Sequence, residues 1–268
     1  MKAQLIDGKR ISAEIKAEAA EEAAALKAKG ITPCLAVVLV GDDSASQVYV
    51  NNKKKACEAV GIRSVSHVLS GGTTEEALLE LIAKLNADQD IHGILVQMPV
   101  PKQIDERKVI LAIDPKKDVD CFHPVNVGNL HTGGEGFLPC TPAGIIELIK
   151  RSGHSIEGKQ CVVIGRSNIV GKPVAMLLMQ ENGTVTICHS RTRNLAEICR
   201  GADIIVSAVG KVNTVTADMV KEGAILIDVG MNRNEAGKLC GDVDFENVKE
   251  IAGAITPVPG GVGPMTIA

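Results

Sequence analysis

Short apolar runs alternate with helix-forming segments along most of the chain, and this alternation restricts the possible folds more than any other feature. In the first half, the apolar runs predict strands at residues 34–40, 65–69 and 91–96. The segments around them predict helices at residues 11–29, 44–60, 73–87 and 104–113. Strands that alternate with helices are typical of a parallel sheet built from βαβ units.

The second half repeats the alternation in shorter units. Residues 115–142 are rich in Gly, Pro, His and Asn, so we expect loops and a domain junction there. After a helix that starts at Thr141-Pro142 and runs to Lys150, further strands and helices follow: predicted strands at 160–164, 184–188, 203–208 and 224–229, and predicted helices at 170–180, 194–199 and 216–220. The predicted fold class is α/β, with two α/β domains at residues 1–140 and 141–268. We expect the second to be a Rossmann-like doubly wound parallel sheet, with a cleft between the two domains.

Net charge, the lack of long apolar stretches and the spacing of the Cys argue against nucleic-acid, membrane and metal partners. The net charge of the 268 residues is −3, which argues against nucleic-acid or anionic-membrane partners. We find neither a membrane-spanning apolar stretch nor a signal-peptide core. The eight Cys include no Cys-x-x-Cys pair, so we expect free thiols and a cytoplasmic location. Cys121 with His123, or Cys188 with His189, could ligate a metal, but neither pair has a suitably spaced second pair, and we expect no metal.

A glycine-marked loop follows one predicted strand and opens a helix. It reads Gly165-x-Ser167-x-x-x-Gly171, and a dinucleotide-binding loop requires this strand–loop–helix context. Glycine permits the tight turn, and the helix N-terminus offers free amides to a pyrophosphate. The loop departs from Gly-x-Gly-x-x-Gly, because a serine replaces the second glycine and the last glycine is displaced by one. An ordinary strand-to-helix turn remains the alternative.

The end of the next predicted strand bears on the choice of cofactor. An NAD-binding fold usually has an acidic residue here, which accepts a hydrogen bond from the ribose hydroxyl. This chain instead has Ser190, Arg191 and Arg193, whose hydroxyl and guanidinium groups suit a 2′-phosphate. The pattern favours NADP, unless the two arginines are only solvated surface charges.

The candidate catalytic pair lies far upstream of the glycine-marked loop. Tyr49 and Lys53 are four residues apart on a predicted helix, which places the phenol and the amine on one face. A Tyr-x-x-x-Lys pair also occurs in short-chain dehydrogenases, where it follows the nucleotide loop within the same domain. Here it precedes the loop by more than a hundred residues. We therefore expect the chemistry to reside on a first domain that faces a cofactor bound by the second.

Three further segments offer groups to the same chemistry. Gln97 follows an apolar strand, and the carboxylate of Asp120 could bind an amidine-like edge through two parallel hydrogen bonds. Each alone is better explained as an ordinary residue, Gln97 as a strand end and Asp120 as a surface acid. The segment Pro257-Val258-Pro259-Gly260-Gly261-Val262-Gly263-Pro264-Met265-Thr266 could bring backbone close to a flat ligand, or could be a structural turn.

Taken together, five motifs resemble one enzyme family, the bifunctional methylenetetrahydrofolate dehydrogenase/cyclohydrolases. They extend in order along essentially the whole chain: Tyr49-x-x-x-Lys53, Gly93-Ile94-Leu95-Val96-Gln97-Met98-Pro99, Lys117-Asp118-Val119-Asp120, Gly165-Arg166-Ser167-Asn168-Ile169-Val170-Gly171-Lys172-Pro173 and Pro259-Gly260-Gly261-Val262-Gly263-Pro264-Met265-Thr266. Each motif alone is weak, whereas five in register are specific. One departure is Cys121, which stands where the family usually has Gly.

The resemblance implies an NADP-dependent oxidation of 5,10-methylenetetrahydrofolate to the methenyl cation, and hydrolysis of that cation to 10-formyltetrahydrofolate. Lys53 is implied as the key catalytic group, with Tyr49 and Gln97 orienting it and Asp120 holding the pterin edge. The implied residues fall into two sets. The folate set is Ser46, Tyr49, Lys53, Val96, Gln97, Met98, Asp120, Pro259, Gly260, Gly261 and Pro264, and the NADP set is Gly165, Arg166, Ser167, Ser190, Arg191 and Met231. A homodimer formed through the Rossmann domains is also implied.

Two other functions compete with this interpretation. A non-catalytic dinucleotide sensor, regulated through the eight Cys, would need no convergent polar groups in the first domain. A different two-domain NADP dehydrogenase would act on another carbonyl or amine. Tyr49, Lys53, Gln97 and Asp120 count against the sensor, and an assay with the folate substrate would distinguish the second.

Overall fold

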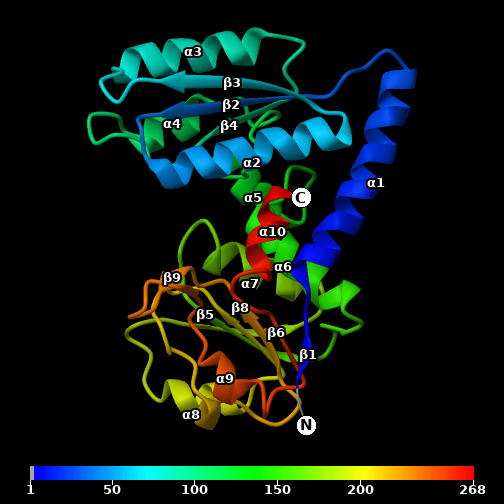
Figure 1. Cartoon of the computed structure of the whole chain (residues 1–268), viewed down its shortest axis with the longest axis vertical. Helices are drawn as coiled ribbons and strands as arrows, with labels where there is room; N and C mark the ends of the chain where they lie inside the picture. Colours follow the sequence, from blue (N-terminus) through cyan, green and yellow to red (C-terminus); the bar gives the residue numbers. More distant parts are fainter. Residues whose placement is uncertain (1–2) are drawn as a thin grey trace. The chain divides into compact units, whose positions relative to one another are not determined.

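The structure, a computed structural model, describes residues 3–268 and divides into two compact units (Figure 1). We call residues 14–138 the three-stranded unit, after its sheet. The six-stranded unit combines residues 3–13 with residues 139–266. Both units contain parallel sheets with helices, so the predicted α/β class is confirmed.

The three-stranded unit contains a parallel sheet in the order β3-β2-β4. Its strands are β2 Cys34–Val40, β3 Arg63–Leu69 and β4 Gly93–Val96. Its helices are α2 Ser44–Val60, α3 Glu75–Ala87, α4 Glu106–Ala112 and α5 Pro124–Thr132, and the unit also includes most of α1 Gly8–Ala28. Because β2 and β4 are parallel neighbours, their carboxyl ends lie at the same edge of the sheet.

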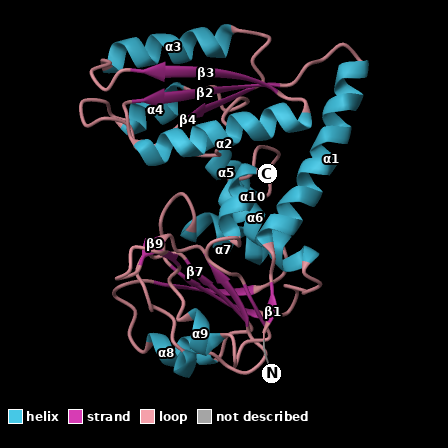
Figure 2. Cartoon of the chain, in the orientation of Figure 1, coloured by secondary structure: helices cyan, strands magenta, loops and turns pink. Residues whose placement is uncertain are grey.

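Helices cover both faces of this sheet, as Figure 2 shows. Alternate residues of β2 explain the arrangement, since Ala36 and Val38 pack with α3 and α4, whereas Val37 and Leu39 pack with α2. Successive side chains of a strand point to opposite faces, so a strand buried on both faces is apolar throughout. That is why β2 reads as one continuous apolar run.

Helix α2 has clear start and stop signals. The carboxylate of Asp43 accepts a hydrogen bond from the Ser46 amide at 2.7 Å, which caps the first turn. The helix ends at Gly61, whose φ of 82° is the left-handed conformation that glycine adopts readily. Val50 and Cys57 are buried on the inward-facing side of α2.

The six-stranded unit is a parallel sheet in the order β1-β11-β8-β7-β5-β6. Its strands are β1 Gln4–Leu5, β5 Gln160–Ile164, β6 Thr184–Cys188, β7 Ile204–Ser207, β8 Ile225–Asp228 and β11 Ala254–Ile255. A separate antiparallel pair consists of β9 Asn232–Arg233 and β10 Leu239–Cys240. Strands β6 and β7 lie on opposite sides of β5, which is the strand order of a doubly wound sheet.

Six helical segments accompany this sheet: α6 Cys140–Arg151, α7 Gly171–Gln180, α8 Leu195–Arg200, the short 3₁₀ turn η1 Ala217–Met219, α9 Phe245–Val248 and α10 Val262–Ile267, whose final residue groups outside this unit. Its core is aliphatic and includes Val162, Ile205 and Leu226 from three neighbouring strands. This sheet confirms the predicted Rossmann-like arrangement.

Three local predictions need correction. Residues 115–142 are not loop throughout, because α5 forms within them, with Pro124 at its first turn and Gly133 as its left-handed C-cap. The segment predicted as a loop near the chain end contains α10. In addition, β1 pairs with β11, so the first strand belongs to the six-stranded sheet, although residues 1–140 were assigned to the first domain from sequence.

The eight Cys all lie within the described residues, and none of them forms a disulfide. Most of them are shielded from solvent. Burial raises the pKa of Cys161 to about 11 and that of Cys199 to about 12. Such thiols carry little thiolate at neutral pH, which disfavours thiol-based regulation at these two positions. In residues 3–268 we find no helix with the length and apolar character needed to cross a bilayer.

Candidate functional site

A polar cluster lies where α2 meets the carboxyl end of β4 in the three-stranded unit. The ammonium Nζ of Lys53 donates a hydrogen bond to Oε1 of Gln97 at 3.1 Å. The amide of Gln97 in turn donates to the carbonyl of Met98 at 3.0 Å. Gln97 therefore fixes the position of the Lys53 amine, and its own orientation is fixed by the backbone of the loop after β4.

The position of Lys53 on α2 follows from helical periodicity. Lys53 is three residues after the buried Val50 and four before the buried Cys57, so it points towards the packed face and is half-buried. Lys54 and Lys55 are exposed. Tyr49, one turn before Lys53, is also half-buried, and this burial raises the pKa of its phenol. Of the three consecutive lysines, only Lys53 is partly withdrawn from solvent.

The carboxyl group of Asp120 interacts electrostatically with the same amine. Burial raises the pKa of Asp120 to about 6, while the charge of Lys53 lowers this pKa and the charge of Asp118 raises it further. The structure thus brings Lys53, Gln97 and Asp120 into one site, although they come from three separate segments. An amine, an amide and a carboxyl group with a raised pKa provide both a proton-transfer group and a hydrogen-bond acceptor for a ligand.

Hydrogen bonds to Asp118 stabilise the turn that carries Asp120. The buried carboxylate of Asp118 accepts from the His123 amide at 2.8 Å and from the Asn126 side chain at 2.9 Å. Cys121, next to Asp120, has a φ of 58°, in the left-handed region that favours glycine. A glycine would adopt this conformation readily, whereas Cys121 adopts it although it carries a Cβ.

The glycine-marked loop makes the tight turn predicted from sequence, but the amides of Val170 and Gly171 at the start of α7 are not free as predicted, because both donate to Ser167. Gly165 follows β5 with a φ of 124°, and a Cβ there would overlap the carbonyl oxygen of Ala208. A Cβ at Gly171 would overlap the carbonyl oxygen of Gly165. The hydroxyl of Ser167 accepts from the Val170 and Gly171 amides, each at 3.2 Å. Arg166 and Ser167 are exposed, so an extended ligand can approach this backbone closely, as a dinucleotide requires.

The strand-end loop after β6 lies beside this loop. Ile164 and Cys188 pair in register, and the amide of Gly165 donates to the carbonyl of Cys188 at 2.9 Å. Ser190 and Arg191 follow directly and are both exposed. Met231 is exposed in the loop after β8, at the same edge of the sheet. The predicted NADP residues are therefore all at the carboxyl edge of one sheet, where doubly wound folds bind ligands.

The predicted folate loop near the chain end belongs to the six-stranded unit. Gly260 has a φ of 106°, and Gly261 precedes α10, in which Pro264 lies. The loop is packed against the start of α1, because a Cβ at Gly8 would overlap the carbonyl oxygens of Gly261 and Gly260. Pro259, Gly260, Gly261 and Pro264 remain predictions as folate contacts, as do Ser46, Val96 and Met98 in the three-stranded unit.

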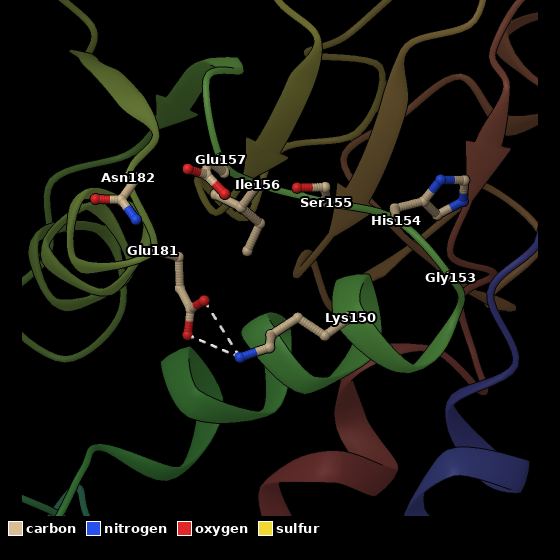
Figure 3. A pocket seen from close by; sticks show the side chains of 8 residues that line it. All are labelled: Lys150, Gly153, His154, Ser155, Ile156, Glu157, Glu181 and Asn182. Atoms are coloured by element: carbon tan, nitrogen blue, oxygen red, sulfur yellow. Dashed lines mark hydrogen bonds and ion pairs between the residues drawn. The ribbon is translucent and has the colours of Figure 1, made fainter.

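A surface pocket of about 470 Å³ lies at the other edge of the six-stranded sheet. It is lined by Lys150 and by residues 153–157 and 181–182, which precede β5 and β6 (Figure 3). Lys150 and Glu181 form an ion pair across it at 3.0 Å. None of the predicted site residues lines this pocket. Within residues 3–268, no group of three or more His, Cys, Asp or Glu side chains could hold a metal ion.

Sequence reasoning missed two buried carboxylates, Asp228 and Asp242, close to the predicted NADP edge. Burial raises the pKa of Asp228 to about 6, and the backbone amides from which it accepts hydrogen bonds oppose this rise. An acid at the end of an apolar strand was a visible signal for Asp228. No local signal marks Asp242, because its partners on the β7 loop are 31–35 residues away in sequence.

Comparison with known families gives an independent test of these motifs. Residues 6–120 match the tetrahydrofolate dehydrogenase/cyclohydrolase catalytic domain, and residues 139–268 match the NAD(P)-binding domain of the same family. The chain belongs to the tetrahydrofolate dehydrogenase/cyclohydrolase family. The predicted resemblance is confirmed, and with it the pair of activities that defines the family.

Individual relatives support the assignment to the dehydrogenase/cyclohydrolase family along the whole chain. The bifunctional protein FolD of Agathobacter rectalis is 62% identical over 99% of this chain and 95% of its own length. The crystal structure of the Campylobacter jejuni FolD enzyme is 53% identical, with a TM-score of 0.96, covering 99% of this chain and 94% of that one. The Trypanosoma brucei enzyme, crystallised with NADP and an inhibitor, is 42% identical with a TM-score of 0.93, covering 100% of this chain and 94% of that one.

Proposed function

We propose that this protein oxidises 5,10-methylenetetrahydrofolate to 5,10-methenyltetrahydrofolate with NADP as the oxidant, and then hydrolyses the methenyl cation to 10-formyltetrahydrofolate. The observation that carries the proposal is the Lys53–Gln97 hydrogen bond beside Asp120, on a chain whose second half forms a dinucleotide-type sheet. In this proposal residues 1–140 provide most of the folate chemistry, and residues 141–268 bind the cofactor.

The two reactions balance as follows. In the first, the bridging carbon of the substrate loses a hydride, for which the nicotinamide ring of bound NADP is the acceptor. In the second, a water molecule adds to the cationic carbon, a C–N bond of the imidazoline ring opens, and one proton is released. The protein must therefore hold the folate, admit one water to the cationic carbon and move a proton away from it.

Lys53 is the group proposed to move that proton. Its amine is held by Gln97 at 3.1 Å, and a cationic substrate beside it favours the neutral, basic form of an amine. Tyr49 shares the helical face of Lys53 and would orient it together with Gln97. Asp120 would accept hydrogen bonds from the pterin edge, in the two-bond geometry that a carboxylate offers.

The remaining folate contacts would shape the binding site rather than take part in the chemistry. Ser46 is buried in the first turn of α2, one turn before Tyr49. Val96 and Met98 flank Gln97 at the end of β4. The glycine-rich backbone of residues 259–264 would lie close to the flat part of the folate, since Gly260 and Gly261 present no side chain to block it.

The proposal is tested directly by an assay of the purified protein. With methylenetetrahydrofolate and NADP, the absorbance of the methenyl product should rise together with that of NADPH. With methenyltetrahydrofolate alone, the methenyl absorbance should fall faster than in the buffer control. A protein that performs neither reaction would contradict the proposed function, and one that performs only the first would contradict the role of Lys53 as a base for water.

We further propose NADP rather than NAD as the cofactor, with Gly165, Arg166 and Ser167 at the pyrophosphate, Ser190 and Arg191 at the 2′-phosphate, and Met231 beside the nicotinamide half. Exchanging the phosphate contacts should reverse this preference. In the double variant Ser190→Asp with Arg191→Ala, kcat/KM for NADP should fall about ten- to hundredfold, because a charge-assisted hydrogen bond contributes about 1.5–3 kcal/mol. The Asp should accept from the free ribose hydroxyl of NAD, so NAD use should be kept or improved.

Arg200→Ala is the matched control for this change. Arg200 is also an exposed arginine of the same unit, but it is in the last turn of α8 and donates to the carbonyl of Asp218. Its loss should leave the ratio of NADP to NAD use unchanged. Equal use of the two cofactors by the unaltered protein would contradict the assignment to NADP.

Two further parts of the proposal concern assembly and location. We propose a homodimer formed through the six-stranded unit, which is the Rossmann-like one. Strand β6 is at one edge of its sheet, where a strand can offer backbone groups to a second copy. Sedimentation that shows a monomer at micromolar concentration would contradict it. We also propose a cytoplasmic location, in keeping with eight Cys that form no disulfide within the described residues.

A further inference from the structure

Asp242 accepts hydrogen bonds from the loops that follow β7 and β8, and so connects them. Its side chain is completely buried, and its carboxylate accepts five hydrogen bonds: from Ser207 Oγ at 3.1 Å, from the amides of Val209, Gly210 and Lys211 at 2.8, 3.2 and 2.9 Å, and from Asn232 Nδ2 at 2.9 Å. A buried carboxylate is stable only when its oxygens receive such donors. The charge of Asp242 therefore holds the backbone of residues 209–211 in one conformation and ties it to Asn232.

A second carboxylate fixes Asp242 itself. Asp228, at the end of β8, accepts from the amides of Gly230, Asp242 and Val243, each at 2.9 Å. The packing around the two acids leaves no room for side chains, because a Cβ at Gly230 would overlap the Asp242 carboxylate and a Cβ at Gly241 would overlap that of Asp228. The two acids thus connect β8 and the loops around it into one hydrogen-bonded assembly.

This assembly touches the predicted dinucleotide loop. Ala208, between Ser207 and Val209, donates its amide to the carbonyl of Ile164 at 2.8 Å, and its carbonyl oxygen occupies the space next to Gly165. Any displacement of residues 207–211 therefore changes the surface against which Gly165 packs. On the exposed side, Val209, Val212 and Met231 present apolar surface from the same loops.

The strand order indicates which half of the cofactor meets these loops. In a doubly wound sheet the dinucleotide crosses the point where the strand order reverses, which here is between β5 and β7. The loop after β6, with Ser190 and Arg191, is on the adenosine side. The loops after β7 and β8 are therefore on the nicotinamide side, where the exposed valines and Met231 offer apolar surface to the flat face of the ring.

We propose that Asp242 is a positioning residue for the nicotinamide half of the cofactor. It does not touch the cofactor; it holds residues 209–211 and Asn232 so that the nicotinamide ring meets a preformed surface. The proposal rests on the proposed function, in that it takes the ligand of this edge to be NADP. Its effect should be confined to the dehydrogenase reaction, because hydrolysis of the methenyl cation needs no nicotinamide.

The experiment is Asp242→Asn, an almost isosteric change that replaces one accepting oxygen with an N–H donor facing the amides of the loop. The Kd for NADPH, measured by fluorescence, should rise about tenfold or more, and dehydrogenase kcat/KM should fall at least as much. The Kd for adenosine 2′,5′-bisphosphate, which lacks the nicotinamide half, should change less than twofold. Cyclohydrolase activity without cofactor should also change less than twofold.

Asp244→Asn is the matched control, since Asp244 is two residues further along and its side chain accepts from Asn247. It should leave all four quantities near their original values. Equal weakening of NADPH and adenosine bisphosphate binding in Asp242→Asn, or an equal loss of both activities, would overturn the proposal, because either outcome indicates general disorder of the unit.

A second variant covers the case in which Asp242→Asn does not fold. Asn232→Ala removes one of the five donors and should produce the same selective pattern, with a severalfold rise in the Kd for NADPH. If Asn232→Ala leaves NADPH binding unchanged, the proposal is wrong whatever the behaviour of Asp242→Asn. Failure of the proposed function would be recognised separately, by an unaltered protein that lacks both activities.

Discussion

Lys53→Met should abolish most of the cyclohydrolase activity while leaving the protein folded. Methionine keeps most of the volume of the lysine stem and removes only the amine that Gln97 orients at 3.1 Å. Proton-transfer groups typically contribute about 10²–10⁴-fold to a rate, so a loss of this size is expected for hydrolysis of the methenyl cation. Dehydrogenase activity should fall as well, because the same amine sets the charge around the folate. Both rates are measured by following the methenyl absorbance.

The neighbouring lysines provide internal controls for this experiment. Lys54→Met and Lys55→Met make the same chemical change about 100° and 200° further round α2, where both side chains are exposed. Neither should reduce either activity by more than a small factor. If Lys53→Met keeps near-normal cyclohydrolase activity, or if a control loses as much, the active site is not at Lys53.

Asp120→Asn should weaken catalysis and strengthen the fold. The carboxylate is proposed to make two hydrogen bonds to the pterin edge, so its loss should lower kcat/KM for the folate by about ten- to several-hundredfold. The same carboxyl is stabilised in its neutral form by burial, with a pKa of about 6 instead of 3.8. A neutral amide at this position avoids burying the charge, so we expect the free energy of unfolding at pH 8 to rise by up to about 3 kcal/mol.

The pH dependence gives this prediction a definite sign. Because the pKa in the folded state is raised, the folded protein binds a proton more readily than the unfolded chain between pH 3.8 and about 6. The carboxyl therefore favours folding below pH 3.8, and this contribution is lost as the pH rises through about 6. The gain from Asp120→Asn should be present at pH 8 and absent near pH 4, in denaturant titrations at the two pH values.

The activity of the unaltered protein should depend on pH in the opposite direction to its stability. In the unaltered protein kcat/KM should fall as the pH drops below about 6, where Asp120 becomes protonated, and this fall should be missing in Asp120→Asn. An Asn variant that is no more stable at pH 8 than at pH 4, relative to the unaltered protein, would contradict the assigned cost of burial. If kcat/KM of Asp120→Asn still fell as the pH dropped below about 6, a group other than Asp120 would be responsible for that fall.

Local signals made much of the fold predictable. Helix α2 was predicted with its observed bounds because Gly61 marks its end and a run of helix formers precedes it. The continuous apolar run of β2 was predicted equally well, since its burial leaves no polar residue to blur the pattern. Strands β5 and β6 were also predicted with their observed bounds, although β6 contains two Thr and is mostly not buried. Helix α5 was missed because its inward-facing Asn126 is buried through hydrogen bonds, so no apolar period marks the segment.

The site was predictable to the extent that its groups lie at element ends. A pair at i and i+4 on a helix and a polar residue after a strand are visible in sequence, and Lys53 and Gln97 indeed meet. The depth of Asp120 was not visible, because its raised pKa depends on the packing around it. Nor could the five donors of Asp242 be predicted, since loops distant in sequence deliver them only after the sheet has formed.

The pairing of β1 with β11 has a consequence for how the chain is made. Gln4 and Leu5 leave the ribosome about 250 residues before their partners Ala254 and Ile255. The sheet of the six-stranded unit therefore cannot be completed until residues 254 and 255 have been synthesised, whereas residues 14–138 can collapse as soon as they emerge. Contacts between such distant segments form slowly, because a loop of about 250 residues must close first. Pulse-labelling of nascent chains should find the inserted three-stranded unit protected from protease well before the strand that precedes it.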